Sequence, residues 1–219
     1  MKLLLTSGGV TNTAISDALV DLLGRPIEES SALCIPTAQW GHSMCRPQSA
    51  WNFVAGRAPS GSMTALPWAS LGLLELTALP SIGRTRWEPW VREADALLVD
   101  GGDATYLAHW MRESGLVDVL PELTDTVWAG VSAGSMVLTP RIGAEFVAWA
   151  DAPDDTTLGL VEFSIFPHLD VFPSNTMDAA ERWAEQIGVP AYVLDDDSAI
   201  RVADGTTEVI SEGRWARLG

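Results

Sequence analysis

The most informative feature of this chain is a serine set between two glycines, Gly130-Val131-Ser132-Ala133-Gly134, where an apolar run meets a short helical pattern. A serine at such a strand-to-helix corner is held in a strained backbone that exposes its hydroxyl over the end of a sheet. The glycines leave room for a tight turn, and a helix that starts at Ala133 directs N–H groups toward an anion beside the serine. The pattern is typical of a nucleophile in acyl transfer, although small residues also build plain tight turns.

A serine nucleophile needs a base, and the chain has three histidines. His42 lies in a loop or helix start and His109 lies within a helical pattern, so both are interpreted as ordinary surface or core side chains. His168 follows Phe166-Pro167 at the end of a short apolar strand, and a proline before it restricts the backbone that directs the imidazole. His168 is therefore the candidate base, with a buried histidine bonded to the backbone as the alternative.

A third residue, a carboxylate, must orient the imidazole and stabilise its cation. Asp195-Asp196-Asp197 follows a predicted strand, and three adjacent carboxylates repel one another unless a cation such as an imidazolium lies near. A solvated turn is the competing interpretation for at least two of them. Chain order also leaves open the acids between the serine and the histidine, namely Glu145, Asp151, Asp154, Asp155 and Glu162.

Alternating strand and helix patterns must position these residues. Up to Ala144 the alternation predicts an α/β fold with a mainly parallel sheet and helices on both faces, and the remainder predicts short strands, one helix and hairpin-like strands near the C-terminus. Gly101-Gly102 and Ser132 then fall at the carboxyl ends of neighbouring strands, where ligands bind in such folds. The predicted strands are 3–5, 32–35, 71–76, 96–99, 127–131 and 191–194, and the predicted helices are 15–23, 44–54, 86–94, 104–114 and 174–187.

Length and composition limit the class of protein. The 219 residues, 47% of them hydrophobic, can bury one substantial core, so we predict a single domain over residues 1–219, with an exposed loop at residues 57–62. The net charge of −16, with Lys2 as the only lysine, argues against nucleic acid and anionic membranes as partners. Two cysteines, Cys34 and Cys45, are too few for a disulfide framework or zinc site, and with no signal peptide or spanning segment we expect a cytoplasmic protein. A homo-oligomer is compatible with this composition.

Four motifs in this order resemble the landmarks of the aspartyl dipeptidase (peptidase E) family of serine peptidases, to which cyanophycinase is related. They are Asp100-Gly101-Gly102-Asp103-Ala104-Thr105, Gly130-Val131-Ser132-Ala133-Gly134, Phe166-Pro167-His168 and Leu194-Asp195-Asp196-Asp197-Ser198. The resemblance covers most of the chain. It implies a fold similar to class I glutamine amidotransferases, with a serine in place of their cysteine.

The resemblance also implies roles for individual residues. Ser132 is the implied nucleophile, His168 the base and then acid, and Asp196 the orienting carboxylate, with Asp197 as runner-up. The N–H groups of Gly102 and Ala133 form the implied oxyanion hole. Neither a metal nor an organic cofactor is required, and the implied substrates are short peptides, among them dipeptides with amino-terminal aspartate.

The chain departs from the family at the position that binds the substrate carboxylate. The family places an arginine there, whereas this chain has Met177, with Arg182 nearby and Arg141 as another substitute. A carboxylate pocket without a cation would leave a desolvated anion uncompensated, so side-chain specificity stays open. The alternative functions are an esterase of the α/β-hydrolase type, which expects its acid before the histidine, and a catalytically silent metabolite-binding protein.

Overall fold

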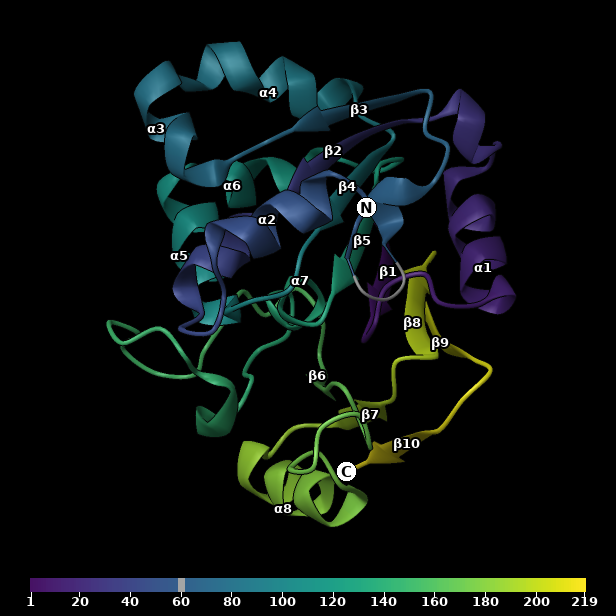
Figure 1. Ribbon diagram of the computed structural model, residues 1–219, viewed down its shortest axis with the longest axis vertical. Coiled ribbons are helices and arrows are strands. Elements are labelled where there is room, and N and C mark those ends of the chain that lie inside the picture. The colour runs from purple at the N-terminus through teal and green to yellow at the C-terminus, as the bar shows by residue number, and fades with distance from the viewer. Residues whose placement is uncertain (59–61) are drawn as a thin grey trace.

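The computed structural model describes residues 1–58 and 62–219 and is built around a seven-stranded sheet in the order β3-β2-β4-β5-β1-β8-β9 (Figure 1). The pairs from β3 to β1 are parallel, while β8 and β9 are antiparallel additions at one edge. A smaller sheet has the order β10-β7-β6. The strands are β1 Lys2–Thr6, β2 Ser31–Ile35, β3 Ser70–Leu73, β4 Ala96–Val99, β5 Val127–Val131, β6 Ser164–Phe166, β7 Ala191–Leu194, β8 Ser198–Ala203, β9 Thr206–Ser211 and β10 Trp215–Leu218. The α-helices are α1 Thr13–Leu23, α2 Pro47–Val54, α3 Leu79–Ile82, α4 Arg84–Glu93, α5 Ala104–Glu113, α6 Leu116–Val119, α7 Ala133–Met136 and α8 Met177–Ile187.

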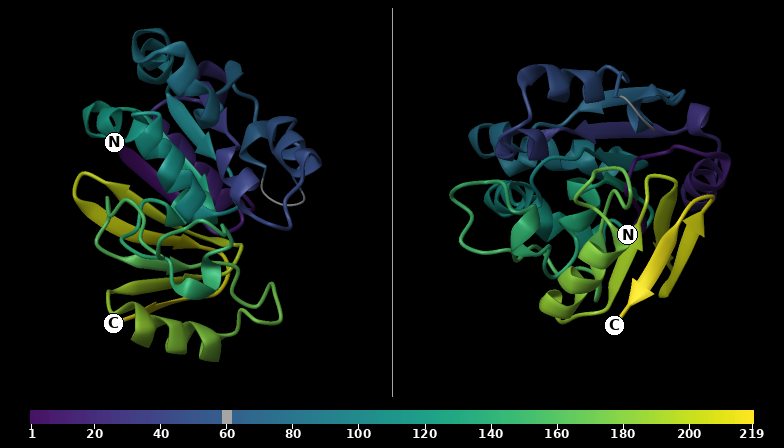
Figure 2. Two further views of the ribbon diagram at one scale, coloured as in Figure 1. Left: turned by 90° about the vertical axis from the view of Figure 1, so that its left-hand side faces the viewer. Right: turned by 60° about the horizontal axis from the view of Figure 1, so that its bottom comes forward.

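The central strands are covered on both faces, as their continuous apolar sequences predict. All residues of β4 are buried, and β5 is buried up to its last residue. Apolar side chains of α1 and α2 pack with one face of the sheet, while those of α4 and α5 pack with the other (Figures 1 and 2). Since a parallel strand covered on both sides has no wet face, it needs an apolar residue at nearly every position. The predicted fold class is confirmed.

The C-terminal third adds a second layer below the main sheet in Figure 1. Helix α8 covers the small sheet, and its buried Ala180, Trp183 and Ile187 pack with residues of β6 and β7. The chain then crosses from β7 in the small sheet to β8 in the large one through the turn at residues 195–197. This crossing brings the three consecutive aspartates close to the end of β1, which pairs with β8.

Several predicted boundaries were wrong for local reasons. Helix α2 begins at Pro47 rather than residue 44, because proline suits the first turn of a helix. Strand β3 ends at Leu73, and Glu75 caps a 3₁₀ turn where the strand was expected to continue. Helix α8 begins at Met177 because Thr176 is its N-cap. Between residue 144 and Pro167 the described chain forms one strand, β6, where several were expected.

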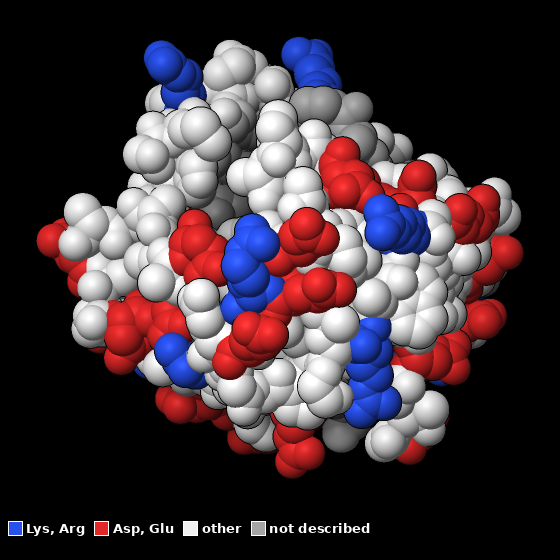
Figure 3. Space-filling model, turned by 90° about the horizontal axis from the view of Figure 1, so that it is seen from below, with Lys and Arg blue, Asp and Glu red and all other residues white. Residues whose placement is uncertain are grey.

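Acidic side chains are spread over the face that carries α8, with basic ones scattered between them (Figure 3). Across residues 1–58 and 62–219, no helix is both long enough and apolar enough to cross a membrane. The predicted loop at residues 57–62 includes residues 59–61, which lie outside the described part of the chain.

Candidate active site

Ser132 occupies the sharp corner between β5 and α7 that its motif predicts. Its φ of 48° and ψ of −111° are a strained combination for a residue with a side chain. The corner is held by the Ser132 N–H, which donates to the carbonyl of Thr6 on β1 at 3.0 Å. A Cβ added to Gly130 would overlap the backbone of Gly134, so β5 and α7 can approach this closely only with glycine at position 130. A Cβ added to Gly134 would overlap the backbone of Val99, so glycine there lets α7 pack against the end of β4.

His168 follows β6 and is positioned from two directions. Its φ of 59° lies in the left-handed region, which is unusual for a residue other than glycine. Its backbone N–H donates to Ser7 Oγ at 2.7 Å, and its ring Nδ1 lies 2.7 Å from Asp196 Oδ1. An ionised carboxylate can only accept, so Nδ1 carries the proton and Nε2 is the ring nitrogen left to accept one.

Asp196 is held against the imidazole by a second donor. Ser7, at the end of β1, donates its hydroxyl to the same Oδ1 at 2.9 Å, and the Ser7 side chain is fully buried. Burial alone raises the pKa of Asp196, but the hydrogen bond and charge of His168, together with the Ser7 hydrogen bond, hold that pKa below its ordinary value. The carboxylate is therefore ionised at neutral pH.

The two neighbouring aspartates, Asp195 and Asp197, do not contact His168 in the described structure. Asp195 accepts from the Ser198 hydroxyl at 2.6 Å and from the Asp197 N–H at 3.1 Å, so it stabilises the turn. Asp197 is exposed. Among the described contacts of His168, none involves an acid that lies between Ser132 and His168 in the chain.

Ser132 and His168 line one cavity of about 540 Å³, to which Gly102 and Ala133 also contribute. Within the described part of the chain, no acceptor receives the backbone N–H of Gly102 or of Ala133. Gly102 has a φ of 136°, and its Cα packs so tightly on the carbonyl of Ala38 that no side chain would fit. The two glycines after β4 thus bring a backbone donor beside the serine corner, and a Cβ on Gly101 would lie 3.5 Å from Ser132 Cβ.

Two buried carboxylates support this glycine loop. Asp100 accepts from the Gly101 N–H at 2.8 Å and from Gln39 Nε2 at 2.7 Å. Burial raises the pKa of Asp100 to about 7, against the lowering effect of those two hydrogen bonds. With a pKa near neutral pH, Asp100 is partly protonated there, so a small change in its burial or hydrogen bonds changes its average charge.

Asp103 is fully buried and accepts four hydrogen bonds. Oδ1 caps α5 by accepting from the Tyr106 N–H at 2.7 Å and the Thr105 hydroxyl at 2.6 Å. Oδ2 accepts from the N–H groups of Ala148 and Trp149 at 2.6 Å and 2.9 Å, which ties that loop to the cavity. The sequence signal for this role is the position of Asp103 directly before a helical pattern, where aspartate is a common N-cap.

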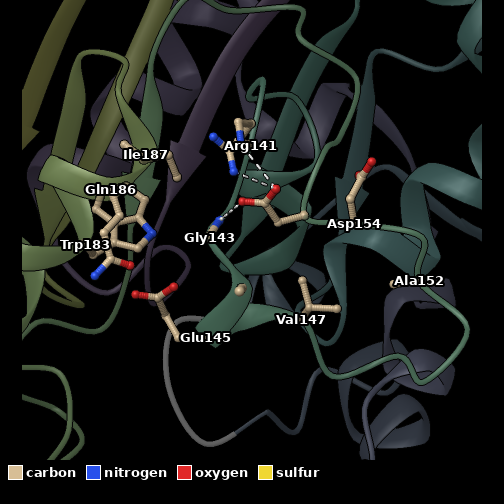
Figure 4. Close-up of a pocket in the computed structure, with 11 residues that line it drawn as sticks. Arg141, Gly143, Glu145, Val147, Ala152, Asp154, Trp183, Gln186 and Ile187 are labelled. Carbon is tan, nitrogen blue, oxygen red and sulfur yellow. Dashed lines mark hydrogen bonds and ion pairs between the residues drawn. The ribbon is translucent and has the colours of Figure 1, made fainter.

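The arginines considered as carboxylate ligands lie outside this cavity. Arg141 makes two hydrogen bonds to Asp155, at 3.0 and 3.1 Å, and lines a separate hollow of about 480 Å³ (Figure 4). Arg182 is exposed on α8 and lines another, adjoining hollow. Met177 is partly buried and packs with the core beneath α8.

His42 and Cys45, which no sequence motif assigned to the site, are among the side chains that line the cavity. The Nδ1 atom of His42 accepts from the Met44 N–H at 3.2 Å. Burial and the negative charge of Asp100 raise the pKa of Cys45, so it is a thiol rather than a thiolate at neutral pH. Within the described residues, no three His, Cys, Asp or Glu side chains are grouped to hold a metal ion.

Known proteins resemble this chain in sequence pattern and in fold. The structure superposes on that of a putative peptidase E protein from Listeria monocytogenes EGD-e with a TM-score of 0.69 and 16% identity, covering 97% of this chain and 98% of that one. It superposes on a peptidase from an acI-B1 actinobacterium with a TM-score of 0.72 and 18% identity, covering 99% and 93%. No curated protein matches the sequence. Residues 65–210, which include the serine corner, His168 and Asp196, match peptidase family S51, and the chain belongs to this family of serine-type peptidases.

Proposed function

We propose that the protein hydrolyses short peptides through a triad of Ser132, His168 and Asp196 and an acyl-enzyme intermediate. The observation that carries this proposal is the 2.7 Å contact between His168 Nδ1 and Asp196 Oδ1 in the wall of the cavity that Ser132 also lines. The contact fixes the tautomer in which Nε2 accepts a proton.

In the first half of the reaction, Ser132 Oγ attacks the peptide carbonyl while its proton passes to His168 Nε2. The negative charge that develops on the carbonyl oxygen is taken up by the N–H groups of Gly102 and Ala133, which have no other acceptor among the described residues. One such donor contributes about 3 kcal/mol to transition-state stabilisation. The carbon–nitrogen bond then breaks, and His168 returns the proton to the leaving amine.

In the second half, water attacks the acyl-serine ester and gives a proton to His168. The ester bond breaks, the proton returns to Ser132 Oγ, and the acid product leaves. Asp196 stays ionised throughout and stabilises the imidazolium that forms in each half. An esterase of the α/β-hydrolase type has less support, because its acid is expected before the histidine and no acid there contacts His168 in the described chain.

Cleavage of peptides with amino-terminal aspartate, which the resemblance implies, is a separate prediction, and the lining of the cavity argues against it. Such cleavage requires a cation beside the substrate side chain. Arg182 is the candidate for this role, because the hollow that it lines shares Phe146 and Asn175 with the cavity.

The proposal is tested with a dipeptide library that varies the amino-terminal residue. We expect Ser132→Ala and His168→Ala each to lower kcat/KM by at least about 1,000-fold. The matched controls, Asp154→Ala and Glu162→Ala, remove carboxylates that lie between the serine and the histidine in the chain and should stay close to wild type. Full activity of the Ser132 variant would refute the proposal.

A further inference from the structure

We infer that the cavity selects peptides with an uncharged, apolar side chain on the residue whose carbonyl Ser132 attacks. This inference rests on the proposed function and adds the substrate class to it. It concerns the walls of the cavity rather than the reacting groups.

The cavity walls are predominantly apolar. Side chains of Met44, Met136, Ile142, Phe146 and Phe172 line it, together with alanines and prolines. Met136 and Ile142 belong to the buried core, so this part of the wall is preformed. An apolar substrate side chain that moves from water onto such a wall gives up no hydrogen bond, so its transfer is favourable.

Two apolar side chains at the cavity are unusually accessible. Met44 is 78% exposed and Phe172 is 51% exposed. Phe172 also packs edge-on against the His168 ring, with 5.4 Å between the ring centroids. Its partly exposed ring therefore lies next to the proposed base in the cavity lining. A bound apolar side chain would cover surface that water now contacts, which favours its binding.

The charges at the cavity oppose an acidic side chain. Of the described residues that line it, none is lysine or arginine, and the one carboxylate is Glu145. Glu145 lines both this cavity and the hollow of Figure 4. A substrate carboxylate placed here would lose water, gain no cation and meet a like charge.

The arginines do not remove this difficulty. Arg141 forms an ion pair with Asp155, whose side chain is only 10% exposed. If Arg141 turned to a substrate instead, the Asp155 carboxylate would stay nearly buried without a partner. Arg182 contributes to the adjoining hollow but not to the cavity wall. The net charge of −16 also makes the approach of an anionic substrate less favourable.

Three dipeptides of nearly equal size test this inference, with leucine, asparagine or aspartate followed by the same second residue. The asparagine and aspartate pair isolates charge, and the leucine and asparagine pair isolates polarity. We expect kcat/KM to fall in the order leucine, asparagine, aspartate, with leucine at least about 100-fold above aspartate. Aspartate cleaved as well as asparagine, or all three cleaved equally, would overturn the inference and leave the proposed function standing.

A substitution tests the stated cause. Ser174 is exposed and lines the cavity, so Ser174→Arg places a cation at the wall without disturbing the core, and Ser174→Gln is the uncharged control. We expect the arginine variant to lower the ratio of kcat/KM for the leucyl dipeptide to kcat/KM for the aspartyl dipeptide at least about 10-fold. The glutamine variant should leave this ratio unchanged. An unchanged ratio in the arginine variant would overturn the inference. If wild type cleaves none of the three dipeptides, the proposed function fails and the inference fails with it.

Discussion

Ser7→Ala removes a side chain that touches two members of the proposed triad. The Ser7 hydroxyl accepts from the His168 N–H at 2.7 Å and donates to Asp196 Oδ1 at 2.9 Å. Alanine fits the same space but can do neither. The substitution therefore tests whether the first strand positions the base and its carboxylate together.

The magnitude follows from the two contacts. A hydrogen bond to a charged group contributes about 1.5–3 kcal/mol, and a buried N–H left without an acceptor costs about 1–3 kcal/mol. Because water can replace part of both, we expect the free energy of unfolding to fall by about 3 kcal/mol. A base displaced by a fraction of an ångström should also lower kcat by about 10- to 100-fold, with a smaller change in KM.

The pH dependence separates positioning from simple destabilisation. The pKa of Asp196 is below its ordinary value in the folded protein, so its contribution to stability is present above the unfolded pKa and is lost as pH falls through the folded pKa. The Ser7 hydrogen bond is one of the causes of that lowering. In Ser7→Ala the pKa of Asp196 in the folded protein should rise toward its unfolded value, so the stability lost on acidification through this group should be smaller and its loss should end at a higher pH.

The assay combines denaturant unfolding across pH with steady-state kinetics on the leucyl dipeptide. Ser30→Ala is the matched control, because Ser30 is also fully buried and donates to a backbone carbonyl, that of Pro26 at 3.0 Å, away from the cavity. It should cost about 1 kcal/mol and leave kcat and the acid transition unchanged. Wild-type kcat in Ser7→Ala, or an acid transition no different from wild type, would refute the positioning role.

Two further substitutions test the glycine loop and the strand-to-helix corner beside Ser132. The raised pKa of Asp100, about 7, means that its contribution to stability is full below its unfolded pKa of 3.8 and is lost as pH rises through 7. Asp100→Asn does not titrate, and its amide can donate to the unpartnered Oε1 of Gln39 after that side chain flips. Its stability relative to wild type should therefore increase by about 3 kcal/mol from pH 5 to pH 8. A stability difference that does not change with pH would contradict this, and denaturant unfolding at both pH values measures it. Gly130→Ala should lower kcat/KM more than 100-fold and destabilise the fold by more than about 2 kcal/mol, because its methyl group overlaps the backbone of Gly134. Normal kinetics in a stably folded Gly130→Ala protein would show that the close approach of β5 and α7 is not required.

Local sequence patterns predicted much of the site, because its main parts are local structures. The serine corner depends on neighbours within a few residues, and Ser132 has the strained backbone that its motif predicts. The end of β7 placed the three aspartates at a turn, and the family resemblance pointed to Asp196, with Asp197 as runner-up. The apolar pattern that predicted a strand over residues 71–76 was wrong at its end. There the Glu75 side chain caps a 3₁₀ turn, which stops the strand.

The sequence by itself determined the alternating strands and helices, the serine corner and the candidate base and acid, since each is encoded by residues close together in the chain. The tertiary structure alone decided which distant residues support them. Ser7 and His168 are 161 positions apart, and Asp103 reaches 45 positions to the N–H of Ala148. It also decided what lines the cavity, whose described lining is mainly apolar and includes no arginine. Such contacts follow from how strands and loops pack in space, and no local pattern of residues encodes them.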